Sequence, residues 1–118
     1  MATFRDLLIW QKSMLVVTDI YAITTNFPTS EIYSLTSQLR RSAISIPSNI
    51  AEGYGRQGTK DYLKFLNIAI ASLFEMQTQI EIAYNLKYID QTQFNKIYED
   101  SREIERMISA FTRKIKTS

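Results

Sequence analysis

The strongest constraint on the fold is a helical repeat of apolar residues that occurs in four stretches of the chain. In residues 59–86, apolar side chains alternate steps of four and three, at Tyr62, Leu66, Ala69, Leu73, Met76, Ile80 and Ala83. This spacing places them along one side of an α-helix and is typical of a helix packed in a bundle. Similar stripes predict helices over about residues 4–26, 29–51 and 91–116.

Composition excludes the main competing folds and most catalytic chemistry. The 118 residues include only three glycines and two prolines, too few for the turns of an all-β protein. Neither cysteine nor histidine is present, which excludes disulfides, thiolate chemistry and histidine-based catalysis or metal binding. A carboxylate-only site for a hard cation stays possible. We expect one all-α domain over residues 1–118, an antiparallel up-down-up-down four-helix bundle without enzymatic activity, cofactor or metal.

Pro47 lies inside the second predicted helix. The apolar repeat continues through it to Ile50, so we predict a helix kinked near Pro47, and the alternative is two short helices split at Ile46. Asn49 lies close to the apolar stripe, where a buried amide needs hydrogen-bond partners. We expect its side chain to replace the backbone hydrogen bond that Pro47 removes.

All three glycines fall in one short stretch, residues 52–58. Gly53 is placed to end the second helix in a left-handed conformation. The spacing Gly-x-Gly-x-x-Gly matches a dinucleotide-binding fingerprint, but a helix and not a strand precedes it, so we exclude that interpretation. The start of the third helix at Thr59 is still a possible anion-binding point.

The densest polar segment runs from the second predicted helix through the glycine stretch into the third. A loop that folded back would gather its basic residues into one cluster, with Tyr54 and Tyr62 among them. Cations interleaved with aromatic rings suit phosphate neutralisation and base stacking, so the sequence predicts a nucleic-acid site. The alternative is structural, with the charges solvated or paired to Glu52 or to another subunit. The candidate nucleic-acid-binding residues are Arg40, Arg41, Arg56, Lys60 and Lys64.

Other sequence features bear on location and assembly. The longest apolar runs are too short to span a bilayer and the start of the chain lacks a signal-peptide pattern, so we expect a cytoplasmic protein without membrane contact. Apolar residues occur on more than one side of the first and third predicted helices, which indicates an oligomer. Trp10 and Tyr33 are candidates for a subunit contact.

Three segments carry recognisable motifs: residues 5–14 (RDLLIWQKSM), 27–56 (FPTSEIYSLTSQLRRSAISIPSNIAEGYGR) and 65–80 (FLNIAIASLFEMQTQI). Together they resemble the four-helix bundle protein family whose founding members are encoded by intervening sequences in bacterial 23S ribosomal RNA genes. The middle segment is the most specific, because an arginine pair, a proline and Asn-Ile-Ala-Glu-Gly occur in that order. One departure is IAIASL, where the family often has a glycine before the serine.

The resemblance implies a homopentameric ring and similarity to the accessory variability determinant of diversity-generating retroelements. That protein binds a reverse transcriptase and nucleic acid through its basic surface. The family has no assigned enzymatic activity, and its cellular role is largely unknown. We therefore expect a non-enzymatic oligomer that binds RNA or DNA, and the alternative is a protein–protein scaffold engaging a partner such as a reverse transcriptase. The motif residues to single out are Arg40, Arg41, Pro47, Asn49, Glu52, Gly53 and Arg56.

Overall fold

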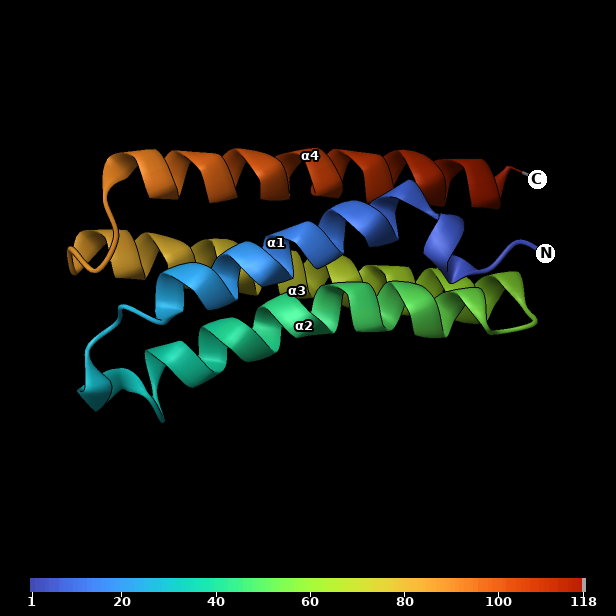
Figure 1. The fold of residues 1–118 in the computed structure, drawn as a ribbon. Helices are drawn as coiled ribbons and strands as arrows, with labels where there is room; N and C mark the ends of the chain where they lie inside the picture. Colours follow the sequence, from blue (N-terminus) through green and yellow to red (C-terminus); the bar gives the residue numbers. More distant parts are fainter. Residues whose placement is uncertain (118) are drawn as a thin grey trace.

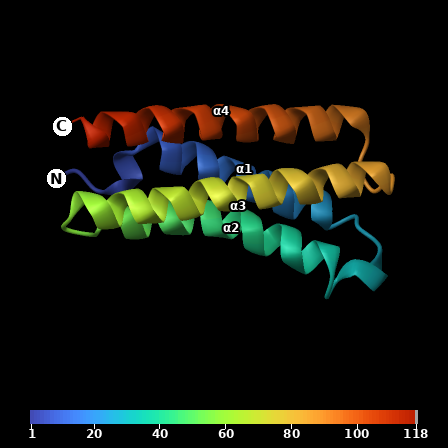
Figure 2. The same cartoon turned by 180° about the vertical axis from the view of Figure 1, so that it is seen from behind.

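The computed structural model describes residues 1–117, in which four long α-helices form an elongated bundle of about 46 × 23 × 23 Å. The helices are α1 (Leu8–Thr24), α2 (Leu35–Tyr54), α3 (Thr59–Asn85) and α4 (Gln91–Lys116). Consecutive helices run in alternate directions and lie side by side (Figure 1 and Figure 2). The all-α four-helix bundle predicted from the apolar repeat is confirmed.

The bundle core is built from the predicted stripes. On α3, the six residues that follow Tyr62 in the repeat, from Leu66 to Ala83, are fully buried. They meet side chains of equal burial on the other helices, including Ile20 on α1, Ile46 on α2 and Ile108 on α4. A single apolar core therefore runs through all four helices, as expected when each helix buries one stripe.

Two helices begin later than the sequence predicts, because a 3-10 turn takes the place of the first helical turn. Phe4–Asp6 forms the first such turn, capped by the Asp6 carboxylate, which accepts a hydrogen bond from the Thr3 N–H at 2.8 Å. Thr29–Glu31 forms the second, so the predicted start of α2 near residue 29 is wrong. The Glu31 carboxylate accepts hydrogen bonds from the Leu35 N–H at 3.3 Å and the Tyr88 hydroxyl at 2.8 Å, which fixes this turn to the segment after α3.

A ladder of polar side chains joins α2 to α3 within the bundle. The Ser42 hydroxyl donates to Gln79 Oε1 at 2.7 Å, and the Ser72 hydroxyl donates to Ser45 Oγ at 2.8 Å. The Asn49 amide donates to the carbonyl and the hydroxyl of Ser45, at 2.8 and 2.9 Å. Small hydrogen-bonded side chains let the two helices approach closely and leave these polar atoms satisfied.

The structure corrects two expectations about Pro47. α2 is continuous from Leu35 to Tyr54, so the alternative of two helices split at Ile46 is wrong. Pro47 has no N–H to donate to the Ala43 carbonyl, and the Asn49 side chain was expected to take its place. The Asn49 amide instead donates to the Ser45 carbonyl, so this expectation is wrong. The kink near Pro47 stays a prediction.

Gly53 was expected to end α2 in a left-handed conformation, and this is wrong. It lies inside α2, is buried, and no glycine in residues 1–117 has a positive φ. A Cβ at this position would lie 2.9 Å from the Phe65 Cβ and 3.0 Å from Tyr62 Cδ1. The glycine is therefore required by the close approach of α3 to α2, and the helix ends one residue later, at Tyr54.

We expect Gly53→Ala to destabilise the fold by about 1–3 kcal/mol, because the new methyl group overpacks the α2–α3 contact. Helix propensity alone predicts the opposite, a gain of up to about 1 kcal/mol. Gly58→Ala is the matched control: no atom lies within 4 Å of its added Cβ, so the change should be neutral or slightly stabilising. Urea unfolding followed by circular dichroism measures both, and equal stability of the two variants would contradict the packing argument.

We expect Tyr62→Phe to stabilise the protein by about 1 kcal/mol, because the Tyr62 hydroxyl is buried without a hydrogen-bond partner in residues 1–117. Burial, with a smaller effect of Tyr54, raises the pKa of Tyr62 from 10.0 to about 12. The unfolded chain thus loses this proton at lower pH than the folded one, so the wild type loses stability as the pH rises from 10 towards 12. Thermal unfolding at pH 8 and pH 11 should show the variant's advantage growing, and a constant advantage would refute the assignment.

Candidate nucleic-acid interface

Three segments distant in sequence meet at one end of the bundle: the start of the chain, the α2–α3 loop and the end of α4 (Figure 1 and Figure 2). Aromatic contacts hold this end together. The Tyr62 ring at the start of α3 contacts Tyr54 of α2 and Phe111 of α4, with ring centroids 6.4 and 5.7 Å apart. We call residues 1–8, 52–64 and 110–117 the basic end.

The basic end concentrates positive charge. It holds seven of the chain's 14 basic residues and only three of its 12 acidic residues, a net charge of +4, while the rest of the chain carries −2. The basic side chains at this end are Arg5, Arg56, Lys60, Lys64, Arg113, Lys114 and Lys116, and all seven residues are exposed. Such a one-sided distribution creates a positive field over this end even though the whole chain is nearly neutral.

The basic side chains at the basic end differ in whether an acidic side chain pairs with them. Arg56 pairs with Glu52 at 3.0 Å, and its guanidinium lies 4.8 Å from the centre of the Phe65 ring. Lys60 and Lys64 lie one turn apart beside an open groove of about 490 Å³ on the outer side of α3. Neither lysine makes an ion pair within residues 1–117, whereas Arg56 is partly neutralised by Glu52.

The structure separates the five predicted basic residues into two groups. Arg56, Lys60 and Lys64 lie at the basic end, but Arg40 is fourteen residues before Tyr54, the last residue of α2, which is about 21 Å along the helix at 1.5 Å per residue. The loop does not fold back because α2 stays helical to Tyr54. Sequence reasoning also missed four basic residues at this end. The signal that could have found them is the up-down order, which brings the start of the chain and the end of α4 beside the α2–α3 loop.

Arg40 and Arg41 belong to a different place, an open groove of about 490 Å³ between the end of α1 and the start of α2. The Arg40 Nε–H donates to Thr24 Oγ1 at 2.9 Å, and its guanidinium lies over the Tyr21 ring at 4.5 Å from the ring centre. Arg41 is exposed. We call this site the arginine groove, and its lining is Tyr21, Ile32, Tyr33, Thr36, Ser37, Arg40, Arg41 and Ile44.

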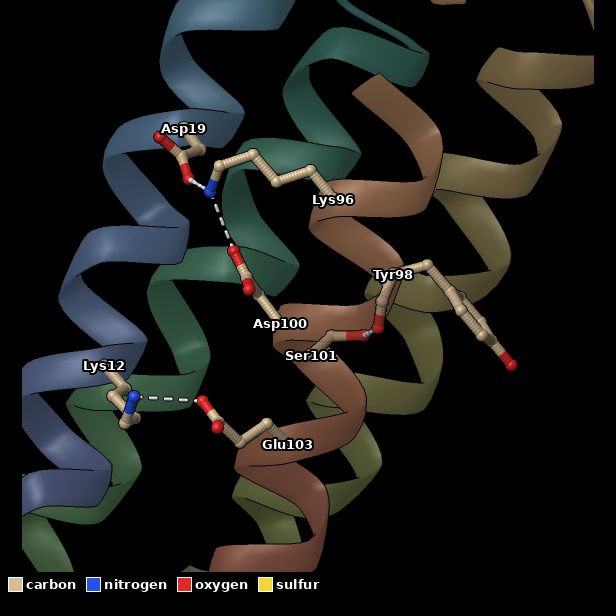
Figure 3. Close-up of polar contacts among 7 residues, drawn as sticks. All are labelled: Lys12, Asp19, Lys96, Tyr98, Asp100, Ser101 and Glu103. Atoms are coloured by element: carbon tan, nitrogen blue, oxygen red, sulfur yellow. Dashed lines mark hydrogen bonds and ion pairs between the residues drawn. The ribbon is translucent and has the colours of Figure 1, made fainter. Parts of the chain in front are cut away.

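Two ion pairs join α1 to α4, and a third lies within α4 (Figure 3). Lys12 of α1 pairs with Glu103 at 3.0 Å, and Lys96 of α4 bridges Asp19 and Asp100 at 3.2 and 2.9 Å. Hydrogen bonds to Asp100 and then Asp19 raise the pKa of Lys96. Within residues 1–117, no group of three or more acidic residues is placed to hold a metal ion, and no helix is long and apolar enough to cross a membrane.

Comparisons with known proteins agree with the fold. A family model described as 23S rRNA-intervening sequence protein matches residues 5–110. Among solved structures, the chain is similar to a protein of unknown function from the S23 ribosomal protein family of Bacteroides thetaiotaomicron, with a TM-score of 0.82 and 26% sequence identity. That similarity covers 89% of this chain and 98% of the other. No curated protein matches the chain.

Proposed function

The chain belongs to the family of the 23S rRNA-intervening sequence protein, and we propose that it is a non-enzymatic protein that binds RNA or DNA through its basic end. The observation that carries this proposal is the clustering of seven exposed basic side chains where three segments of the bundle meet. Each lysine or arginine that neutralises a phosphate releases a condensed counterion, which supplies affinity without reading sequence.

The local geometry of the basic end fits phosphate contacts better than catalysis. Its cations are exposed at the end of the bundle where three segments meet, and Lys60 and Lys64 lie beside an open groove on α3. Arg113, Lys114 and Lys116 lie in the last turn of α4, where they also offset the negative end of the helix dipole. Long, exposed cationic side chains of this kind adapt to the spacing of a phosphate backbone.

We propose further that the protein works as a homo-oligomer. The family resemblance implies that this oligomer is a pentamer. Two unlike surfaces support association: Leu15 on α1 is 66% exposed, and Ile68, Phe74 and Ile82 are exposed on α3. Large apolar side chains left exposed on two helices favour association, because contact with a second copy would remove them from water. A cyclic assembly would repeat the basic end around its axis and raise the affinity for a long nucleic acid through multivalency. A protein partner, the alternative given above, would use the same surfaces.

We expect binding of structured RNA to weaken steeply with salt, and we expect Lys60→Glu with Lys64→Glu to weaken it about tenfold or more at low salt. The double variant should also flatten the slope of log K against log salt by about 1 to 2, because two phosphate contacts are lost. Fluorescence anisotropy across a salt series measures both quantities.

The matched control reverses two charges away from the basic end, Lys87→Glu with Arg106→Glu, so that the net charge changes equally. It should retain most of the affinity and the original slope. Equal losses in the two double variants would show that only net charge matters, and salt-independent or absent binding by the wild type would refute the proposed function.

We expect light scattering of the purified protein to give a mass several times the 13.7 kDa of one chain. Leu15→Glu should lower that mass, because a carboxylate cannot be buried unpaired in an apolar contact. Asn95→Glu, at an exposed polar position on α4, serves as the control. A wild-type mass of one chain at micromolar concentration would refute the oligomer.

A further inference from the structure

We propose that the arginine groove binds a nucleoside phosphate, with the base stacked on Tyr33 and the phosphate held by Arg40 and Arg41. The ligand class rests on the proposed function, but the site is separate from the basic end. The same chemistry is presented by a free nucleotide and by an unpaired nucleotide in a single strand. A fully paired duplex does not present it, because its bases are stacked inside the helix.

Arg40 is held in a fixed orientation. Its Nε–H is used by Thr24 and one face of its guanidinium lies against the Tyr21 ring, both from α1. The two terminal amino groups make no hydrogen bond or ion pair within residues 1–117. Since a guanidinium fixed at its Nε side presents its remaining donors as a rigid fork, Arg40 is prepared for a phosphate without further ordering.

Arg41 adds a second cation that is free of local compensation. It is exposed and makes no ion pair within the described part of the chain, and no carboxylate lines the groove. Glu31, the acidic residue nearest in sequence, accepts hydrogen bonds from Tyr88 and from the Leu35 N–H and lies outside the lining. The positive charge of the groove is therefore not neutralised by the groove itself.

Tyr33 supplies the stacking surface. It lies in the short turn between Thr29–Glu31 and α2, and it is 92% exposed, more than any other large apolar or aromatic residue after Met1. Ile32 and Ile44 line the same groove and give the base an apolar wall. The volume of about 490 Å³ is of the size that holds a small organic ligand. Stacking a base on the exposed Tyr33 ring removes apolar surface from water, which favours binding.

The test compares one labelled single-stranded RNA of about twelve nucleotides with the duplex of the same sequence, by fluorescence anisotropy at fixed salt. We expect Tyr33→Ala to weaken single-strand binding about tenfold while leaving duplex binding unchanged, because one stacked base is lost. Tyr33→Phe keeps the ring and should bind within about twofold of the wild type. Tyr98→Ala, which removes a half-buried ring on α4 outside both proposed sites, should have no such selective effect.

Arg41→Gln provides an independent readout. It should flatten the salt dependence of single-strand binding by about 0.7, the value for one phosphate contact on a single strand. Calorimetric titration with a nucleoside monophosphate distinguishes a free nucleotide from an unpaired nucleotide within a strand as the ligand. Binding that Tyr33→Ala abolishes supports a free nucleotide as ligand, and an effect confined to the strand supports an unpaired nucleotide in a chain.

The proposal is overturned if Tyr33→Ala and Arg41→Gln bind all three probes like the wild type, or if single strand and duplex weaken equally. It is also overturned if these variants change only the mass measured by light scattering, since the groove would then be an interface between copies. If binding survives in these variants but fails in the Lys60 and Lys64 double variant, the groove is refuted while the proposed function stands. If the nucleotide binds in the groove and nothing binds at the basic end, the proposed function of the basic end is refuted while the groove stands.

Discussion

The close contact between α2 and α3 is the constraint on which the rest of this structure depends. Gly53 leaves no room for a side chain against Tyr62 and Phe65, and the hydroxyls of Ser42, Ser45 and Ser72 are small enough to hydrogen-bond between the two helices. These polar bonds can form in only one register, because a shift of one residue would bury their donors without acceptors. The apolar core brings α2 and α3 together, and these specific hydrogen bonds fix how the two helices align.

That alignment decides where the charged groups lie. With α2 helical as far as Tyr54, Arg40 stays at the α1 side of the bundle while Arg56 is carried to the far end. The Tyr54–Tyr62–Phe111 ring contacts then bring the last turn of α4 beside the α2–α3 loop. The arginine groove and the basic end are therefore two consequences of the same helix packing, and each has its own set of cations.

The sequence predicts the fold well because each helix carries its own signal. The repeat from Leu66 to Ala83 identifies its buried stripe without knowledge of the other helices, and Asp90 marks the start of α4 through a capping box with Gln93. The errors arise where the deciding interaction is between helices. Gly53 looks like a helix terminator until Phe65 is placed against it, and the start of α2 depends on Glu31 reaching Tyr88. No single stretch of sequence predicts the basic end, because the segments that carry Arg5, Lys60 and Lys114 come to the same end of the bundle only in the folded chain.

The excess positive charge lies at one end of the elongated bundle, while several acidic groups elsewhere are paired. Asp19, Asp100 and Glu103 are engaged by Lys12 and Lys96 on the side where α1 meets α4, so three acidic groups are locally compensated (Figure 3). Within residues 1–8, 52–64 and 110–117, the acidic side chains are Asp6, Glu52 and Asp61, fewer than the seven basic ones. An elongated molecule with its uncompensated charge at one end turns that end towards a polyanion as it approaches. The arginine groove lies towards the opposite end of the bundle, between the end of α1 and the start of α2, so only a strand that follows the long side of the bundle could reach both sites.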